Sequence, residues 1–361
     1  MASWQPSETS GVSQPVLLCG YYGEHNLGDD ALLEALLAQL PAGTSALVTA
    51  FDQPEVERRH HVATVQRRSL RAVLAALKQC RGLVLGGGSL LQDSTSFRSL
   101  LYYAALITSA RLQSKPVVLW AQGLGPLQRR RSRALVRLLL PMATGISWRD
   151  PGSARLARQL GAQAPHGSDA VWSLPRQHWL GRGGPIVVCW RPTAHLQGHA
   201  WRPWLEALEQ LAEQEQREVI WLPFHRDQDA DLLAQLSEQG LVGEALAHRS
   251  RVVVARTPAE AMALFRSAGL VLAMRLHALI LAALSGSPVS ALSYDPKVQA
   301  CATELGCSCI NLADPAPGLP VLVSLWSEAL DNPPTAAALA SMAGATAVHR
   351  ELLQRQWTLE G

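Results

Sequence analysis

The thirty residues GLVLAMRLHALILAALSGSPVSALSYDPKV, at positions 269–298, alternate apolar strand and helix patterns in close succession. The apolar runs are Gly269–Ala273, Ala278–Leu284 and Val289–Leu292. Strands that are apolar on both faces and are joined by a helix are typical of a parallel sheet covered on both sides. Arg275 and His277 interrupt this apolar passage. Because a buried charge must be paired, the stretch also predicts an anion beside these two side chains.

The same alternation extends over most of the chain. It predicts further strands at Val16–Cys19, Ala46–Ala50, Gly82–Leu85, Pro116–Ala121, Gly145–Trp148, Ile186–Trp190, Glu218–Leu222 and Arg251–Val254, with helical patterns between them. Strands that alternate with helices in this way indicate βαβ units. We therefore predict an α/β fold of two similar halves, each with a parallel sheet.

The length of 361 residues suggests two domains, at about 100–200 residues each. The alternation pauses at a Gly- and Pro-rich stretch, which we interpret as a linker. The predicted parts are a disordered tail at 1–14, a domain at 15–174, a linker at 175–184, a second domain at 185–333 and a helical tail at 334–361. We expect the helical tail to pack back on the first domain.

Composition excludes several classes of protein. The chain is 48% hydrophobic and 17% charged, as expected for a globular enzyme rather than a disordered chain. A net charge of +3 is too mild to indicate a nucleic-acid partner. The apolar runs fall short of the roughly 20 residues that a membrane span needs, and residues 1–14 lack a signal-peptide pattern. We expect a cytoplasmic protein.

The sequence gives no strong metal motif. Six cysteines are scattered, and the one close pair, Cys307 and Cys309, lacks partners at zinc-site spacing, so reduced thiols are expected. Asp229 and Asp231 resemble a D-x-D metal motif, but they lie in a polar helical stretch. We interpret them as a solvated acidic face and expect no metal requirement.

Ligands of open α/β sheets gather beyond the carboxyl ends of the strands, so the residues that follow each predicted strand are candidates for a site. In the first half these segments are GYYGEHNLGDDALLEALL (20–37), GGGSLLQD (86–93), QGLGPL (122–127) and SWRD (147–150). Glycines there allow tight loops or a close approach of backbone to a ligand. Asp29 or Asp30 is expected either to cap the following helix or to have a catalytic role. For Arg149 the alternative to a ligand is an ion pair with Asp150.

In the second half the strand ends carry PFHRDQD (223–229), Arg275-Leu276-His277 and SYDPKV (293–298). A helix that begins near Arg275 offers free backbone N–H groups to a phosphate or carboxylate. Arg275 can bind such an anion through two hydrogen bonds, and Lys297 adds a point charge. His277 can titrate near neutral pH; the alternative is a histidine satisfied within the core.

These motifs, taken in order over residues 16–300, resemble the polysaccharide pyruvyltransferase family, and most closely its CsaB-type enzymes. The resemblance implies a GT-B-like architecture, in which two Rossmann-like domains face a central cleft. It also implies an enzyme that transfers pyruvate from phosphoenolpyruvate to two hydroxyls of one sugar, forming a cyclic ketal and releasing phosphate. The expected product belongs to a cell-wall or exopolysaccharide precursor, and no cofactor is expected.

The resemblance also implies roles for individual residues. Phosphoenolpyruvate would be bound, on the side of the second domain, by Arg149, Arg275, the Leu276 backbone amide, His277 and Lys297. Loops on the acceptor side would contribute Asn26, Gly28, Gly87, Gly88, Ser89, Gln122 and Gly123. Ketal formation needs an acid and a base, for which we expect His277 as proton donor and either Asp29 or Asp30 as base.

Two other functions fit the same pattern. A GT-B glycosyltransferase that uses a nucleotide sugar would share the fold, and a non-enzymatic two-domain solute-binding protein would share the cleft. The sequence leaves open the acceptor sugar, its linkage and stereochemistry, its carrier (nucleotide, lipid or polymer) and the oligomeric state.

One further segment, QRRRSRALVRLLL at 128–140, predicts an amphipathic basic helix. Its first interpretation is a surface helix whose leucines lie in the core. Its second is that Arg129, Arg130, Arg131, Arg133 and Arg137 bind an anionic membrane surface or the diphosphate of a lipid-linked sugar, while the leucines stay buried.

Overall fold

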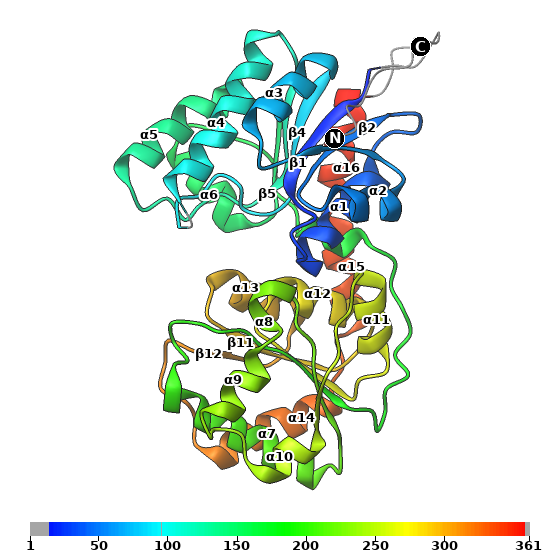
Figure 1. The fold of residues 1–361 in the computed structure, drawn as a ribbon, viewed down its shortest axis with the longest axis vertical. Helices are drawn as coiled ribbons and strands as arrows, with labels where there is room; N and C mark the ends of the chain where they lie inside the picture. Colours follow the sequence, from blue (N-terminus) through cyan, green and yellow to red (C-terminus); the bar gives the residue numbers. More distant parts are fainter. Residues whose placement is uncertain (1–13, 95, 358–361) are drawn as a thin grey trace. The chain divides into compact units, whose positions relative to one another are not determined.

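The computed structural model describes residues 14–94 and 96–357, which form two α/β units (Figure 1). Of the described residues, the N-terminal unit contains 14–23, 36–94, 96–167 and 348–357. The C-terminal unit contains Glu24–Ala35 and Ser168–Ala347. The expected disordered tail at 1–14 lies, apart from Gln14, outside the described residues.

The N-terminal unit is built on a six-stranded parallel sheet, ordered β3-β2-β1-β4-β5-β6. Its strands are β1 (Val16–Tyr22), β2 (Ala46–Ala50), β3 (Ala63–Gln66), β4 (Gly82–Gly86), β5 (Val117–Gln122) and β6 (Gly145–Trp148). Its helices are α2 (Gln53–His60), α3 (Leu70–Gln79), α4 (Phe97–Leu112), α5 (Arg130–Leu139), α6 (Pro151–Gln159) and most of α16 (Ala347–Trp357). Helices α3 to α6 bury their apolar faces against the sheet in one continuous core.

The C-terminal unit repeats this plan with a sheet ordered β12-β11-β10-β7-β8-β9. Its strands are β7 (Ile186–Cys189), β8 (Val219–Trp221), β9 (Ser250–Val252), β10 (Leu270–Ala273), β11 (Val289–Ser293) and β12 (Cys309–Asn311). Its helices include α7 (Arg202–Gln214), α8 (Arg226–Asp229), α9 (Leu232–Glu238), α10 (Glu244–Arg249), α11 (Pro258–Arg266), α12 (Leu276–Leu284), α13 (Pro296–Leu305), α14 (Leu319–Leu330) and α15 (Ala336–Ala345).

Both sheets have the doubly wound strand order, in which the winding direction reverses once. The reversal lies between β1 and β4 in the first sheet and between β7 and β10 in the second. The predicted fold class of two Rossmann-like domains with parallel sheets is therefore confirmed. The point of reversal is where ligands of such sheets bind, and Arg275 directly follows the β10 side of it.

The unit boundaries differ from the predicted ones in three places. The Gly- and Pro-rich stretch at 175–184 is packed within the C-terminal unit, because the N–H groups of Gln177 and Leu180 donate to carbonyls of Leu284 and Arg266. The predicted helical tail is shared between the two units: α15 belongs to the C-terminal unit, and most of α16 belongs to the N-terminal unit. The expected packing of the tail on the first domain thus holds for α16, where Trp357 lies against Gly82.

The third difference concerns residues 24–35, which include the first part of α1 (Leu27–Gln39). This segment pairs with the loop after β8. The N–H of Leu27 donates to the carbonyl of Phe224 at 3.1 Å, and the N–H of Arg226 donates to the carbonyl of His25 at 3.0 Å. Asn26 and His225 form the antiparallel bridge between these two hydrogen bonds. The acidic start of α1 consequently belongs to the C-terminal unit.

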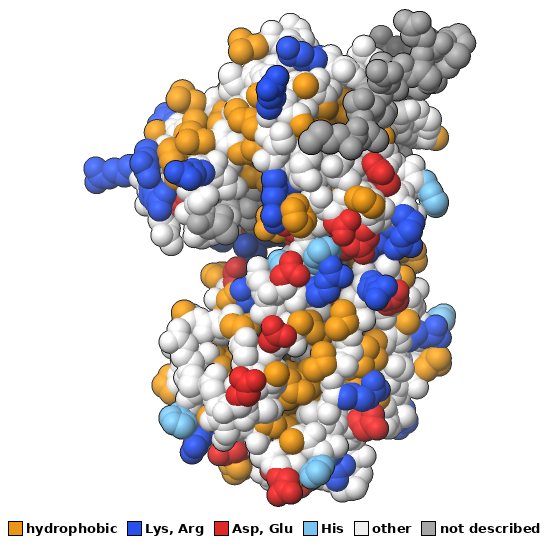
Figure 2. Space-filling view, in the orientation of Figure 1, with side chains coloured by type: hydrophobic (Ala, Val, Ile, Leu, Met, Phe, Trp, Pro, Cys, Tyr) orange, Lys and Arg blue, Asp and Glu red, His pale blue; other side chains and the backbone are white. Residues whose placement is uncertain are grey.

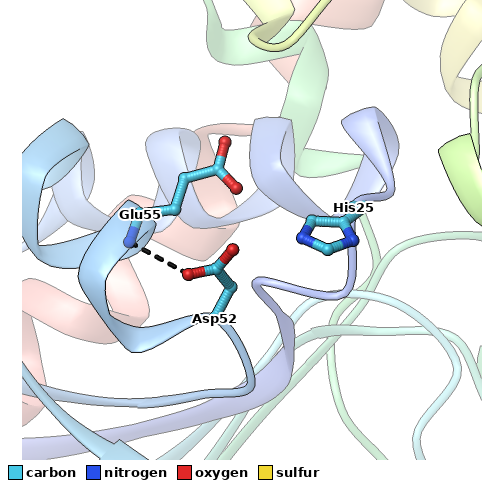
Figure 3. A group of neighbouring side chains, drawn as sticks. All are labelled: His25, Asp52 and Glu55. Carbon is cyan, nitrogen blue, oxygen red and sulfur yellow. Dashed lines mark hydrogen bonds between the residues drawn. The ribbon is translucent and has the colours of Figure 1, made fainter.

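Short polar side chains begin several helices. Asp52 precedes α2, and its carboxylate accepts the backbone N–H of Glu55 at 3.2 Å (Figure 3). Ser69 and Ser96 cap α3 and α4 in the same way. These caps satisfy N–H groups that have no partner within the helix. Within the described ranges, no helix is long and apolar enough to cross a membrane.

Asp93 fixes the approach to α5. Its two carboxylate oxygens accept the N–H groups of Gln128 and Arg129, each at 2.9 Å. Burial raises the pKa of Asp93, but the hydrogen bonds from Gln128, Ser132 and Arg129 outweigh burial, so the pKa lies below the ordinary 3.8. The carboxylate is therefore the form that the folded protein favours.

We expect Asp93→Asn to lower the free energy of unfolding by about 1–3 kcal/mol, because one amide donor is left facing a buried N–H. Urea unfolding measures this loss, with the exposed Asp314→Asn as control. A carboxyl whose folded pKa is depressed stabilises the fold above its unfolded pKa and loses this contribution as pH falls through the folded value. The difference between the native protein and Asp93→Asn should thus be full above about pH 4 and should shrink in stronger acid. A constant difference through the acid range would contradict this assignment.

Candidate active site

Arg149 is the buried cation at the strand ends of the N-terminal unit. It follows β6 with 5% of its area exposed. Its Nη2 donates to Ser89 Oγ at 2.9 Å, and its Nε lies 3.6 Å from Asp150 Oδ2. The expected ion pair with Asp150 is present, but that carboxylate also caps α6 by accepting the N–H and Oγ–H of Ser153. Arg149 is thereby oriented toward the loop that follows β4.

Glycines let the loops around Arg149 approach closely. Gly87 and Gly88 have φ of +61° and +71°, a left-handed conformation that side chains disfavour. At Gly123 a Cβ atom would lie 2.4 Å from Ser89 Oγ and 2.6 Å from Arg149 Nη2. The Ser89–Arg149 hydrogen bond therefore requires glycine at position 123.

Gln122 is not available to a ligand in this structure. Its side chain is fully buried, and its Nε2 donates to the carbonyls of Leu85 and Gly87 at 3.0 Å each. Gln122, which the sequence analysis assigns to the acceptor-side loops, ties the end of β5 to the end of β4. The preceding residue, Ala121, has φ of +47°, a strained conformation that turns the chain at this point.

Arg275 is the central cation of the C-terminal unit. It is the last residue before α12, and it forms a two-pronged ion pair with Asp229: Nη2 lies 2.6 Å from Oδ1 and Nε lies 3.2 Å from Oδ2. The Asp229 side chain has no exposed area. The interpretation of Asp229 as part of a solvated acidic face is therefore wrong, although Asp231 is exposed. A carboxylate 46 positions away supplies the anion that the sequence predicted for Arg275.

The remaining edge of the Arg275 guanidinium is only partly used. Its Nη2 also donates to Gln228 Oε1 at 3.2 Å, whereas its Nη1 makes no hydrogen bond with the described residues. Arg191, which follows β7, donates to the same Gln228 oxygen at 3.4 Å and to the Tyr294 hydroxyl at 3.2 Å. Two arginines thus converge at the point where the second sheet reverses. Sequence reasoning missed Arg191, although it directly follows a predicted strand.

His277 is the second residue of α12 and is held by a carboxylate. Its Nε2 lies 3.4 Å from Oδ2 of Asp169, which is itself buried and accepts the N–H of Val171 at 3.1 Å. Asp169 caps the short helix η2 (Ala170–Ser173). Sequence reasoning missed Asp169, because its 108-residue separation from His277 gives no local signal. A carboxylate partner and a partly exposed ring distinguish His277 from a histidine packed in an apolar core.

The first turn of α1 lies directly against His277. A Cβ atom on Gly28 would be 2.2 Å from His277 Nδ1, so only glycine fits without displacing the ring. Asn26 organises this turn: its Nδ2 donates to Asp29 Oδ2 at 2.5 Å, and its Oδ1 accepts the Gly28 N–H at 3.0 Å. Of the two candidate bases, Asp29 is half-buried, whereas Asp30 is 5% exposed. Asn26, Gly28 and Asp29 thus belong with His277 rather than with the loops of the N-terminal unit.

The other predicted residues lie at neighbouring strand ends. Leu276 opens α12, so its backbone N–H has no partner within the helix. Lys297 lies in the first turn of α13, after β11, with its Nζ 3.5 Å from Asp295 Oδ2. Asp295 also accepts the Lys297 N–H at 3.0 Å, which caps the helix.

His225 is a further titratable group beside Arg275 that sequence reasoning did not single out. Burial, followed by the positive charge of Arg275, lowers its pKa below the ordinary 6.5. It is 6% exposed, and its Nδ1 has no hydrogen-bond partner among the described residues. Its backbone N–H donates to Asp229 Oδ2 at 2.9 Å. An uncharged imidazole therefore lies next to the Arg275–Asp229 pair at neutral pH.

Comparison with protein families identifies the family of this chain. The model of the family described as polysaccharide pyruvyl transferase matches residues 26–296 of the 361. The chain belongs to the polysaccharide pyruvyl transferase family. It is accordingly a transferase of polysaccharide biosynthesis, and the solute-binding alternative falls away. The matched range contains every predicted site residue from Asn26 to His277, but ends one residue before Lys297.

Comparison with solved structures gives similar folds at low identity. A Listeria monocytogenes protein assigned as a UDP-N-acetylglucosamine 2-epimerase matches 96% of this chain and 98% of its own, with a TM-score of 0.62 and 13% identity. Anabaena Alr3699/HepE, solved with UDP and glucose, matches 96% of each chain (TM-score 0.56, 13% identity). Acinetobacter baumannii MurG matches 95% of this chain and all of its own (TM-score 0.52, 14% identity). These likenesses show the GT-B fold alone. Comparison with curated proteins gives no match.

We expect Gly28→Ala to lower transferase activity by about 10²-fold, because the added methyl group must displace the His277 ring. Gly344→Ala, in α15, is the control, since a Cβ there meets nothing within 4 Å. A double-mutant cycle on thermal stability separates the clash from general damage. Gly28→Ala should destabilise the native protein more than the His277→Ala variant, in which only the contact with the Cβ of residue 277, at 2.9 Å, remains. Equal destabilisation in both backgrounds would contradict the assigned contact.

Proposed function

We propose that this transferase moves pyruvate from phosphoenolpyruvate to two hydroxyls of one sugar, forming a cyclic ketal and releasing phosphate, as a CsaB-type enzyme. The observation that carries the proposal is the start of α12. There Arg275 has one edge paired with Asp229 and an Nη1 that makes no hydrogen bond with the described residues, and His277 follows two residues later. The acceptor is a sugar of a cell-wall or exopolysaccharide precursor, on a carrier that the site residues do not specify.

The donor's chemistry matches the groups around Arg275. Phosphoenolpyruvate carries both a carboxylate and a phosphate, so it needs more than one cationic contact. Arg275 Nη1, the first-turn N–H groups of α12 and Lys297 supply positive charge at neighbouring strand ends. No cofactor is needed, because the enol phosphate is already activated.

The proposed reaction begins with transfer of a proton from His277 to the methylene carbon of phosphoenolpyruvate, which becomes a methyl group. The neighbouring carbon develops oxocarbenium character, and the first sugar hydroxyl adds to it while Asp29 accepts the hydroxyl proton. Cleavage of the bond between this carbon and the phosphate oxygen then releases phosphate. The second hydroxyl closes the ketal and gives its proton to the departing phosphate, and the proton on Asp29 returns to His277. The two hydroxyl protons thus end on the new methyl group and on the phosphate, and the enzyme regains its starting protonation.

The structure suggests how His277 and Asp29 are positioned for these roles. Asp169 holds the Nε2 side of the imidazole ring, and the backbone of Gly28 fixes its Nδ1 side. Asn26 orients the Asp29 carboxylate one residue beyond Gly28. Of the two candidate bases, we assign Asp29, since it is half-buried and oriented by Asn26, whereas Asp30 is buried.

The test compares phosphoenolpyruvate with nucleotide sugars, because the similar Anabaena fold was solved with UDP and glucose. Phosphoenolpyruvate should raise the melting temperature and, with candidate sugar acceptors, should give phosphate and a product with the mass of a pyruvate ketal. Arg275→Lys should lose most of this thermal shift, since a point charge cannot replace the planar guanidinium. Stabilisation by a nucleotide sugar alone, with glycosyl transfer, would establish the glycosyltransferase alternative instead.

We expect His277→Gln to keep the phosphoenolpyruvate-induced thermal shift but to lose about 10²–10⁴-fold in kcat, the usual contribution of a positioned acid or base. Glutamine preserves polarity and approximate size, so the anion-binding groups should remain in place. The matched control is His248→Gln, whose histidine side chain is 79% exposed. His248 precedes β9, the edge strand that lies three strands from β10 in the sheet. Native kcat in His277→Gln, measured by phosphate release, would remove His277 from the proton transfer.

A further inference from the structure

The basic residues of this chain are unevenly distributed. Residues 94–149 contain nine of its 32 lysines and arginines and none of its 29 aspartates and glutamates. The rest of the chain therefore has 23 basic and 29 acidic residues, and its net charge is negative. Although the net charge of the chain is only +3, residues 94–149 are strongly cationic. This segment includes α4 and α5 of the N-terminal unit.

Most of this charge is exposed on and just before α5. The exposed arginines are Arg129, Arg130, Arg131, Arg133 and Arg137. None of the five forms an ion pair with a residue in the described part of the chain. The charge of Arg129 acts on Asp93, whose carboxylate accepts the backbone N–H groups at the helix start. The other four arginines form no ion pair with a carboxylate of the described residues.

The same face exposes apolar side chains. Sequence reasoning placed the leucines of this helix in the core, which is correct for Leu139 and Leu140, but Leu138 is 71% exposed. Leu138 and Arg131 are seven residues apart, so they share one side of α5. The expectation that only the arginines could make contact is therefore wrong.

Helix α4 extends this face. The Arg131 guanidinium lies 4.2 Å over the ring of Phe97, the first residue of α4. Leu101 follows Phe97 by one turn and is 46% exposed. In Figure 2, Lys or Arg side chains and hydrophobic side chains gather together in the region that Figure 1 labels α5. We call the exposed residues Arg129, Arg130, Arg131, Arg133, Arg137, Leu101 and Leu138 the α5 face.

We propose that the α5 face binds the surface of a membrane that contains anionic lipids. Arginines bind lipid phosphates, and each basic residue near such a surface strengthens the attraction. Exposed leucines between them can enter the boundary between headgroups and acyl chains, as in amphipathic helices that lie on membranes. A soluble polyanion would use the arginines but would gain nothing from Leu138 and Leu101. The lipid surface therefore explains both kinds of side chain, and it does so whether or not the proposed pyruvyl transfer is correct.

Sedimentation with vesicles tests this proposal on the whole protein. We expect binding to vesicles of phosphatidylcholine with phosphatidylglycerol, no binding to phosphatidylcholine alone, and a decrease in binding as salt rises. Changing Arg130, Arg131 and Arg133 together to Gln should weaken binding by about 10²-fold. The matched control changes Arg176, Arg182 and Arg202 to Gln, which removes the same charge from exposed positions of the C-terminal unit.

Leu138→Gln distinguishes a lipid surface from any other polyanion. It leaves all five arginines in place, so a surface that recognises charge alone would bind vesicles as well as native. We expect Leu138→Gln to weaken vesicle binding several-fold and to leave binding to soluble dextran sulfate unchanged. Unchanged vesicle binding by Leu138→Gln, equal losses in the two triple variants, or no preference of the native protein for anionic vesicles would each overturn the proposal.

Discussion

The ion pair between Arg275 and Asp229 is the constraint on which the C-terminal unit's site depends. A fully buried carboxylate is stable only when it is paired and hydrogen-bonded, and removing one partner of such a pair typically costs about 3–5 kcal/mol. Asp229 takes both prongs from Arg275 and a third hydrogen bond from the His225 N–H. The pair therefore fixes the loop after β8 against the start of α12.

The loop after β8, which the ion pair fixes, in turn positions the start of α1. Phe224, His225 and Arg226 pair with His25, Asn26 and Leu27, so the loop after β8 holds the first turn of α1. Gly28 then brings the backbone of this turn against His277, and Asp29 follows directly. The Arg275–Asp229 pair and the Asp29 segment are thus linked, through the loop after β8, within one unit. The position of His277 depends on contacts from three segments that are far apart in sequence.

The sequence was sufficient to predict ten of the twelve strands, because most of them are buried on both faces and read as continuous apolar runs. It missed β3 and β12, two edge strands that are only partly buried and so give no continuous apolar run. It also predicted Arg275, His277 and Arg149, since each stands at a strand end where an ionisable residue interrupts an apolar pattern. It could not identify their partners. Asp229 looks solvated in its local polar context, and Asp169 lies 108 residues from His277. The sequence also did not show that residues 24–35 belong to the C-terminal unit, because pairing between two loops leaves no periodic pattern.

Arginine at position 275 satisfies two requirements that a lysine could not meet together. Its Nε and one face of Nη2 bind Asp229 side by side, which neutralises the buried carboxylate and fixes the guanidinium plane. Because the group is a rigid fork with five donors, Nη1 is then held in a defined direction rather than being free to rotate toward Asp229. A compact ammonium would direct its charge to the buried carboxylate alone. The ion pair that first suggests a purely structural arginine is thus what would orient the remaining donor toward an anionic substrate.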